Sequence, residues 1–205
     1  MADETTKVIT WRPMGLDDIP RISDWFWNFT DAALFDRTLP VPVSVDALRE
    51  SWRDSIVQKS QPGAYWFIAE DDATPVGVAG LESVNYIQGD AVLPFFVTDG
   101  FRKKGLATAM TVAMLDLAFK RLRLHRVTTY YRSDNAATAR VLEKFGFAEE
   151  GRFREAWFVD GKRQDTVIAG ILEAEWIATR DKVIEDVAGS CNLSFSPTCW
   201  KESLG

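Results

Sequence analysis

The chain has few of the residues that build metal centres and disulfide frameworks. Its 205 residues include one histidine, His125, and two cysteines, Cys191 and Cys199, which both lie in the last segment. A disulfide framework, a cysteine-rich metal site and a histidine-based zinc site are therefore not indicated. A serine–histidine–aspartate triad would have to use His125, which precedes an expected strand and is interpreted as structural. We expect no bound metal.

Long apolar runs and an excess of positive charge are absent as well. No apolar stretch approaches the roughly 20 residues of a membrane-spanning helix, and the acidic start at 1–4 lacks the regions of a signal peptide. A formal net charge of −6 argues against general nucleic-acid binding and is compatible with a cationic acceptor. We expect a cytoplasmic protein, a monomer or homodimer, that binds neither membranes nor nucleic acid. A hydrophobic fraction of 46% suits one domain with a sizeable core.

The chain does contain a basic, glycine-containing turn between an expected strand and an expected helix. The apolar run at 91–97 predicts a buried strand, and 106–124, without proline or glycine, predicts a long helix. The turn between them carries three consecutive cations at 102–104. Free N–H groups and the helix dipole attract anions, and Gly105 would let a phosphate approach the backbone. The turn thus predicts a phosphate site, although an ordinary turn with solvated cations has the same pattern.

Apolar spacing and turn residues predict further elements along the chain. Short links between the second, third and fourth strands predict an antiparallel meander, and the helix before the fifth strand predicts a parallel crossover. Asp160-Gly161 predicts a hairpin turn with positive φ angles. We expect one domain over 1–178 and a C-terminal helix with a loosely held tail over 179–205. Strands are expected at 8–12, 65–69, 76–81, 91–97, 127–131, 147–159 and 166–172, and helices near 16–29, 45–59, 106–124, 136–145 and 173–184.

Two motifs together resemble a known family. The turn reads Arg102-x-x-Gly105-x-Ala107, and the segment 135–147 reads N-x-x-T-x-x-x-L-E-K-x-G-F. These motifs resemble the two signatures of the GNAT acetyltransferase superfamily, and most closely the branch of ribosomal-protein N-terminal acetyltransferases of the Rim type. The stretch 124–127 and the hairpin at Asp160-Gly161 fit that branch too. The resemblance covers about residues 8–176.

The resemblance implies an α/β fold with a mixed, mostly antiparallel sheet of six or seven strands, flanked by helices and splayed at the central strand. It also implies acetyl-CoA as the acetyl donor, with coenzyme A as a product. A primary amine would attack the thioester directly. The amine could belong to a protein N-terminus or to a small molecule such as an amino sugar, a polyamine or an antibiotic. The alternative function is a non-catalytic acyl-CoA-binding regulatory module.

The resemblance also assigns residues to the cofactor. The pyrophosphate would lie on the loop backbone, the pantetheine arm would run along the central strand as an extra strand, and the asparagine of the second motif would meet the amide arm. The expected cofactor-binding residues are Phe96, Val97, Arg102, Lys103, Lys104, Gly105, Leu106, Ala107, Thr108, Asn135, Thr138 and Lys144.

Two positions depart from the family pattern. Val92 stands where members often have a glutamate on the central strand, and Leu142 stands where many members have a tyrosine that protonates the leaving thiolate. Thr138 occupies the usual serine position of the Rim branch, so its hydroxyl is the candidate acid. Tyr131 and Glu155 are further candidates for catalysis, although the pattern favours a packed tyrosine and a surface carboxylate.

The acceptor side is predicted from aromatic residues and one carboxylate. Trp25 and Trp27 lie close together in an amphipathic stretch, where packing one helix face does not need both. Together with Phe35 they are expected to line the acceptor cleft. Glu82 is a candidate base or acceptor-orienting group, or a surface carboxylate.

Overall fold

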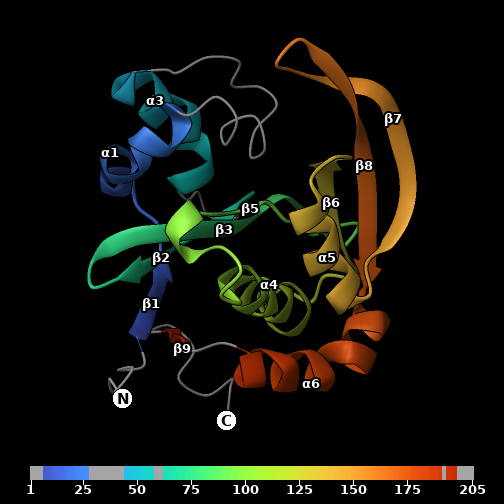
Figure 1. Cartoon of the computed structure of the whole chain (residues 1–205). Coiled ribbons are helices and arrows are strands. Elements are labelled where there is room, and N and C mark those ends of the chain that lie inside the picture. The colour runs from blue at the N-terminus through green and yellow to red at the C-terminus, as the bar shows by residue number, and fades with distance from the viewer. Residues whose placement is uncertain (1–6, 28–43, 58–61, 191–192, 198–205) are drawn as a thin grey trace.

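In the described part of the chain, nine strands form one mixed sheet (Figure 1). The structure, a computed structural model, describes residues 7–27, 44–57, 62–190 and 193–197. Its strands run in the order β7-β8-β6-β4-β3-β2-β1-β9, and β5 pairs with β3 beside this path. The strands are β1 (Lys7–Pro13), β2 (Tyr65–Asp71), β3 (Thr74–Asn85), β4 (Asp90–Val92), β5 (Phe95–Val97), β6 (Arg126–Arg132), β7 (Ala148–Val159), β8 (Lys162–Leu172) and β9 (Leu193–Pro197).

The described strands exceed the predicted six or seven for two reasons. The expected central strand at 91–97 is divided into β4 and β5, because the chain departs from regular pairing at Leu93 and Pro94. Proline has no N–H to donate to a ladder. In addition, β9 pairs in parallel with β1. The sequence predicts a loosely held tail there, but residues 193–197 are held by backbone pairing, which apolar spacing does not reveal.

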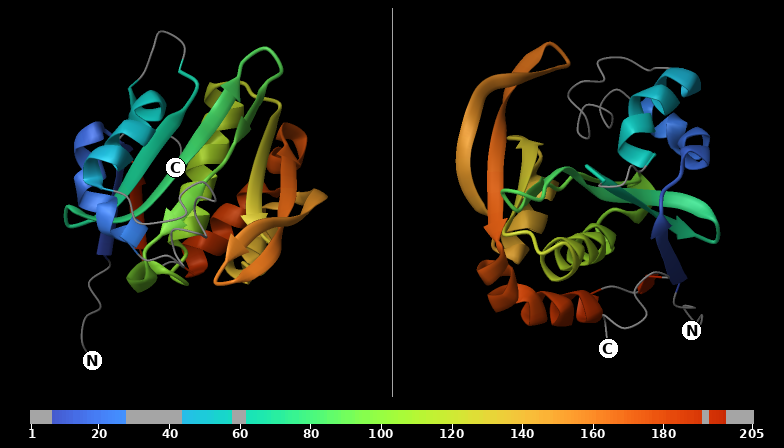
Figure 2. Two further views of the ribbon diagram at one scale, coloured as in Figure 1. Left: turned by 90° about the horizontal axis from the view of Figure 1, so that it is seen from above. Right: turned by 180° about the vertical axis from the view of Figure 1, so that it is seen from behind.

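Helices cover both faces of the sheet. The described helices are η1 (Leu16–Asp18), α1 (Ile19–Ile22), η2 (Ser23–Trp27), α3 (Val45–Ile56), η3 (Asp99–Phe101), α4 (Leu106–Asp116), η4 (Leu117–Arg121), α5 (Ala136–Phe145) and α6 (Glu173–Ser190). α1 and α3 lie over β2 and β3, whereas α4 lies on the opposite face and α6 packs below it (Figures 1 and 2). The expected domain boundary at 178 falls inside α6. None of the described helices is both long and apolar enough to cross a membrane.

Two expected helices are interrupted. The stretch from Leu16 forms a 3-10 turn, one turn of α-helix around Pro20 and a second 3-10 segment in place of one continuous helix. Proline is tolerated only near a helix start, so a long helix through this position would lose a hydrogen bond. The helix expected at 106–124 changes to π-helical hydrogen bonding over η4. By contrast, α3 begins where expected, because Ser44 caps it by accepting from the N–H of Ala47.

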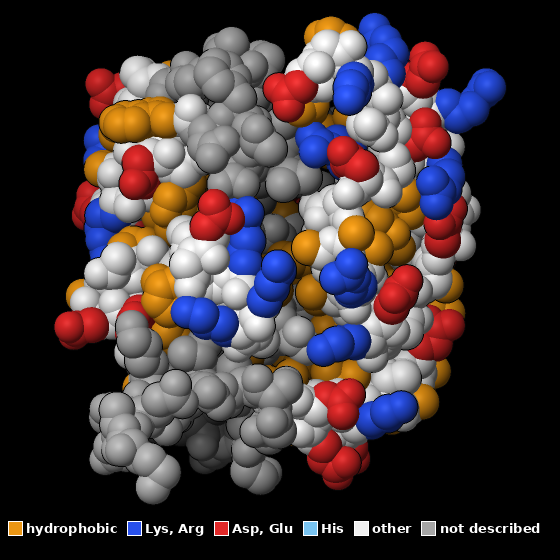
Figure 3. Space-filling view, in the orientation of Figure 1, with side chains coloured by type: hydrophobic (Ala, Val, Ile, Leu, Met, Phe, Trp, Pro, Cys, Tyr) orange, Lys and Arg blue, Asp and Glu red, His pale blue; other side chains and the backbone are white. Residues whose placement is uncertain are grey.

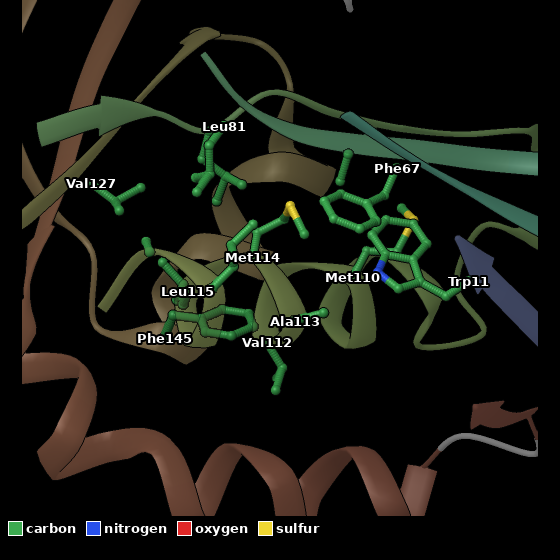
Figure 4. Packing of buried hydrophobic residues seen from close by; sticks show 14 of the residues in the cluster. Trp11, Phe67, Leu81, Met110, Val112, Ala113, Met114, Leu115, Val127 and Phe145 are labelled. Atoms are coloured by element: carbon green, nitrogen blue, oxygen red, sulfur yellow. The ribbon is translucent and has the colours of Figure 1, made fainter. Parts of the chain in front are cut away.

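The largest core surrounds α4, which is apolar on nearly every side (Figure 4). Trp11 stacks on Phe67 at 5.4 Å between ring centroids above the start of this helix. At its other end Asp116 accepts hydrogen bonds from the Trp176 indole (3.0 Å) and from the Arg180 guanidinium (2.8 Å). Burial alone would raise the pKa of Asp116, but these hydrogen bonds hold it below its usual value. α4 is therefore fixed to both the sheet and α6, and its N-terminus has a defined position.

A separate charge network around two buried carboxylates, Asp18 and Glu70, fixes the helices on the other face. Arg12 on β1 donates to Asp18 (2.7 and 2.8 Å) and to Glu70 on β2 (2.9 Å), while Arg21 donates to Asp18 at 2.7 Å. Burial alone would raise the pKa of Asp18, but the hydrogen bonds from Arg12, the Gly15 N–H and Arg21 lower it to about 2. The network therefore ties η1 and α1 to the strands beneath them.

Candidate active site

The sheet separates at the interruption of the central strand. β4 pairs in parallel with β6 as far as Val92 and Thr128, and the Leu93 N–H then donates to the Thr128 carbonyl at 2.8 Å. Beyond this point, in the described part of the chain, β5 pairs only with β3, and β6 continues along β8. We call the space between β5 and the end of β6 the opening. It confirms the expected splay at the central strand (Figure 2).

The backbone of β5 presents hydrogen-bonding groups to the opening. On its β3 side, the Pro94 carbonyl accepts from the Gly80 N–H at 3.0 Å, and the Thr98 N–H donates to the Val76 carbonyl at 3.0 Å. Backbone groups alternate between the two edges of a strand, so the N–H groups of residues 95 and 97 point away from β3. An extended amide-containing chain could therefore pair with this edge as an added strand.

The basic turn places a helix N-terminus beside the opening. Gly105 is the N-cap residue of α4 with φ of +81°, a conformation that glycine adopts without steric cost. The first helical hydrogen bond runs from the Ala109 N–H to the Gly105 carbonyl at 2.9 Å. The N–H groups of 106–108 precede this bond, so they have no acceptor within the helix. This arrangement suits an anion such as pyrophosphate.

The three cations of the turn lie in different environments. Arg102 donates from Nε to the Val97 carbonyl at 2.8 Å, pairs with Asp99, and places its guanidinium 5.6 Å from the centroid of the Phe96 ring. Its side chain therefore braces the turn against β5. Lys103 and Lys104 are exposed. Figure 3 shows basic side chains gathered on this face over the turn and over α5.

The second motif builds a capped helix next to the opening. The Asn135 side chain accepts from the Thr138 N–H at 3.1 Å, and Gly146 ends α5 with φ of +83°. Thr138 is half-buried in the first turn of α5, and Lys144 is exposed in the last turn. Leu142 is buried in the core, so this helix face offers no acid at the position of the family tyrosine.

Tyr131 and Glu155 lie in different environments. Tyr131 lies on β6 on the same face as Val127, the face that α4 and α5 cover. Burial, together with the nearby Glu149, raises the pKa of Tyr131, so the phenol stays protonated at neutral pH. Glu155 is exposed on a bulge of β7 with φ of +54°, and its N–H donates to Asp165 at 2.9 Å. Tyr131 could serve only as an acid, and Glu155 lies in solvent.

Glu82 faces the position that lacks the family glutamate. It lies in register with Val92, which in turn lies in register with Thr128, so these three side chains share one face of the sheet. The Trp66 indole N–H donates to the Glu82 carboxylate at 3.1 Å. Trp66 lies flat across Gly80, where an added Cβ would be 2.7 Å from the indole ring. The structure thus brings a carboxylate to this face from the neighbouring strand.

The aromatic residues expected on the acceptor side are only partly assembled there. Trp25 stacks on Phe96 at 5.2 Å between centroids, which joins η2 to β5. Phe96 packs with the core beneath α1 and α3, so its ring lies on the same face as Glu82. Trp27 is 58% exposed. Phe35 lies outside the described residues.

Sequence reasoning missed a group of polar residues beside the opening. Arg132, Trp157 and Thr166 are buried on β6, β7 and β8, and each has a side-chain polar atom without a partner in the described part of the chain. An arginine at the end of an apolar strand was the available signal. Its partners come from other strands and could not be found by spacing.

Comparisons with known proteins agree with this geometry. Residues 9–148 match the family described as an acetyltransferase (GNAT) domain. The chain belongs to the GNAT acetyltransferase family. It is 30% identical over 105 residues to YdaF of Bacillus subtilis, a candidate ribosomal N-acetyltransferase, with 51% of this chain and 57% of that protein covered. It is 27% identical over 135 residues to spermidine N(1)-acetyltransferase of Vibrio cholerae, with 65% and 76% covered.

Solved structures extend the likeness to the whole fold. The crystal structure of the Vibrio cholerae spermidine N-acetyltransferase with CoA and spermine has a TM-score of 0.72 and 26% identity, and covers 82% of this chain and 98% of that chain. The expected GNAT fold and, at the level of the family, the expected acetyl-CoA-dependent N-acetyltransferase class are confirmed. The Rim branch stays a prediction, because the relatives include both a ribosomal and a spermidine type.

Proposed function

We propose that the protein transfers the acetyl group of acetyl-CoA to a primary amine by direct attack of the amine on the thioester. The observation that carries this proposal is the opening itself. The ladder ends at Leu93 and Thr128, directly beside a helix N-terminus capped by Gly105. One edge suits an amide-containing arm, and the helix end suits its pyrophosphate.

The residues around the opening suit the separate steps of this reaction. Glu82, directly or through a water molecule, takes the proton of the incoming ammonium group. The amine nitrogen then bonds to the thioester carbon, and an N–H of β5 stabilises the oxygen that becomes negative. As the carbon–sulfur bond breaks, the leaving sulfur takes a proton from the Thr138 hydroxyl or, in its place, from Tyr131, and the second proton released by the new amide nitrogen restores that hydroxyl. Glu155 is a weaker candidate because its side chain lies in solvent.

The acceptor class and the assembly are less constrained than the donor. The similarity to a spermidine N(1)-acetyltransferase supports a small amine such as spermidine, whereas the similarity to YdaF, a candidate ribosomal N-acetyltransferase, supports a protein N-terminus. The spermidine N-acetyltransferase of Vibrio cholerae has been solved as a dodecamer. For this chain a monomer or homodimer stays the prediction.

The test is release of free CoA thiol from acetyl-CoA in the presence of a panel of primary amines, with the acetylated product identified by mass. Acetyl-CoA at one hundred times its dissociation constant should also stabilise the fold by roughly 2.7 kcal/mol. Binding without acetylation of any amine would favour the regulatory module instead. A thermal shift no larger than that given by an unrelated nucleotide would contradict both functions.

A further inference from the structure

Three buried polar atoms on adjacent strands have no partner in the described part of the chain. They are Nη1 of Arg132, Nε1 of Trp157 and Oγ1 of Thr166, on side chains of residues that are 7%, 5% and 1% exposed. Arg132 lies in register with Thr166, and Trp157 lies in register with Gln164, two residues earlier on β8. Because alternate residues of a strand share a face, the three side chains belong to one face of the sheet.

This face is the acceptor side of the opening. Val127 points into the core around α4, so the alternating residues Thr128 and Arg132 point to the opposite face. Thr128 shares that face with Val92 and therefore with Glu82. The unpartnered atoms and the candidate base thus lie on the same side of the sheet.

Arg132 also lies, along the strand direction, at the level of β5, where the reaction is expected. The register that pairs Val92 with Thr128 would, if continued, bring Phe96 level with Arg132. The N–H groups of 95 and 97 that face the opening are therefore at the height of Arg132. A group bound there would lie at the same level along the strands as an amine attacking beside these N–H groups.

The chemistry of the three atoms specifies the complementary group. A guanidinium nitrogen and an indole nitrogen are donors only, so each requires an oxygen acceptor. Asp134 already accepts from Nε of Arg132 at 2.5 Å, which leaves Nη1 available. A polyamine carries only protonated or donor nitrogens and could not satisfy either atom. A carboxylate or carbonyl oxygen can accept from either atom, and the Thr166 hydroxyl can donate to such an oxygen as well.

We propose that Arg132, Trp157 and Thr166 form a subsite for a carboxylate or carbonyl oxygen of the acceptor, beside its reacting amine. The proposal rests on the proposed acetyl transfer. It names the acceptor class as an α-amino-acyl amine, either a free amino acid or the first residue of a peptide, in preference to a polyamine.

The experiment compares acceptors that differ only in this oxygen. Alanine, alaninamide, a dialanine peptide, ethylamine and spermidine are tested as acceptors with the wild-type protein. We expect kcat/KM for at least one of the first three to exceed that for ethylamine by at least about 100-fold, since a site built to bind a polar group rejects an analogue without it. If alanine alone reacts, the acceptor is an amino acid, and if the peptide and the amide react, it is a peptide N-terminus.

Conservative variants locate the effect. Trp157→Phe removes the indole N–H and keeps most of the ring, and Thr166→Val removes the hydroxyl at nearly constant volume. Trp157→Phe should raise KM for the preferred acceptor about 10-fold and leave ethylamine turnover and the acetyl-CoA Kd unchanged. Trp11→Phe changes a buried tryptophan of the α4 core and is the matched control, with no expected change in KM.

Two results would overturn the subsite. One is a kcat/KM for spermidine or ethylamine that exceeds those for all three oxygen-bearing amines. The other is a rise in KM in Trp11→Phe equal to that in Trp157→Phe. If no amine is acetylated, the Kd values of N-acetylalanine and N-ethylacetamide for the CoA-loaded protein test the subsite directly. Preference for N-acetylalanine that Trp157→Phe abolishes supports the subsite although acetyl transfer fails, and equal or undetectable binding of the two overturns it.

Discussion

The two sides of the opening are built in different ways. The donor side is one continuous stretch, 102–108, whose contribution is mainly backbone N–H groups at a helix start. The acceptor side is assembled from side chains on β3, β6, β7 and β8, which lie far apart in the sequence. A backbone site depends on a few permitted residues, whereas a side-chain site changes with every substitution. One fold can therefore keep its donor while its acceptor varies, and the similar proteins include both a candidate ribosomal and a spermidine N-acetyltransferase.

The largest effect should come from the donor side. Gly105→Glu forces a side chain into a left-handed backbone conformation and adds negative charge where phosphates approach. We expect the Kd for acetyl-CoA to rise by roughly 100-fold or more, which corresponds to about 3 kcal/mol. Isothermal titration calorimetry measures the change.

Gly161→Glu is the matched control for this substitution. Gly161 also has a positive φ, of +75°, and an added Cβ there would meet no atom within 4 Å. It lies at the tip of the hairpin between β7 and β8, so the same strain and charge should leave the Kd nearly unchanged. Equal losses in both variants would show that strain or net charge explains the effect, and would remove the support for a phosphate site at the turn.

The next effect tests the acceptor side. Glu82→Gln keeps the size of the side chain and removes the base, so kcat should fall by about 10²- to 10⁴-fold while the acetyl-CoA Kd stays the same. The acidic limb of the pH profile of kcat/KM should be lost as well. Glu155→Gln is the comparison, because this carboxylate is exposed, and it should change kcat less than about 3-fold. A larger loss of kcat in Glu155→Gln than in Glu82→Gln would indicate that Glu155, and not Glu82, is the base.

Most of the fold could be predicted because local signals agreed. Apolar spacing, the cap at Ser44 and the turn at Asp160-Gly161 each predict an element that the structure contains. Pro94 was an available signal for the division of the central strand, since proline interrupts a ladder. Pro20 was likewise an available signal for the interruption near 16–29, whereas nothing in the apolar spacing indicates the change to π-helical hydrogen bonding within 106–124.

The donor side could be predicted, and the acceptor side largely could not. The turn at 102–108 is contiguous, so its residues and their spacing carry the signal. The bracing role of the Arg102 side chain depends on Phe96 and Val97 lying behind it. The proximity of Glu82 to Val92, and of Arg132 to Thr166, depends on strand register, which is set by pairing between distant segments.

A smaller effect on catalysis is expected from the candidate acid on α5. Thr138→Ala should lower kcat by about 100-fold at most, at the low end for a positioned proton donor, because water can take the place of the hydroxyl. Acetyl-CoA binding should persist, since Asn135 caps the backbone N–H and not the side chain of this residue. Thr138→Ser keeps the hydroxyl and should retain most activity. A wild-type rate for Thr138→Ala from about pH 6 to about pH 9 would transfer the role to Tyr131 or solvent.

The smallest effect on activity at neutral pH concerns the attachment of the acceptor-side helices. The pKa of Asp18 is lowered to about 2 in the folded protein, below its ordinary value of 3.8. A lowered pKa stabilises the folded state above the ordinary value, and this stabilisation is lost as the pH falls from about 4 towards about 2. The shift corresponds to at most about 2.5 kcal/mol of unfolding free energy. Asp18→Asn should therefore lower stability by about that amount at pH 7, and the difference from the wild type should shrink below about pH 4.

Urea unfolding at several pH values measures this difference, and hydrogen exchange locates it. Acid should increase exchange first in η1 and α1, which the network ties to β1 and β2, and later in α4. Asp17→Asn is the control, because Asp17 is exposed beside Asp18. If Asp17→Asn and Asp18→Asn lose stability equally, the effect is one of net charge and not of the buried network. If the amides of α4 exchange as early as those of α1, the helices on the two faces of the sheet unfold together. The donor and acceptor sides would then have the same local stability.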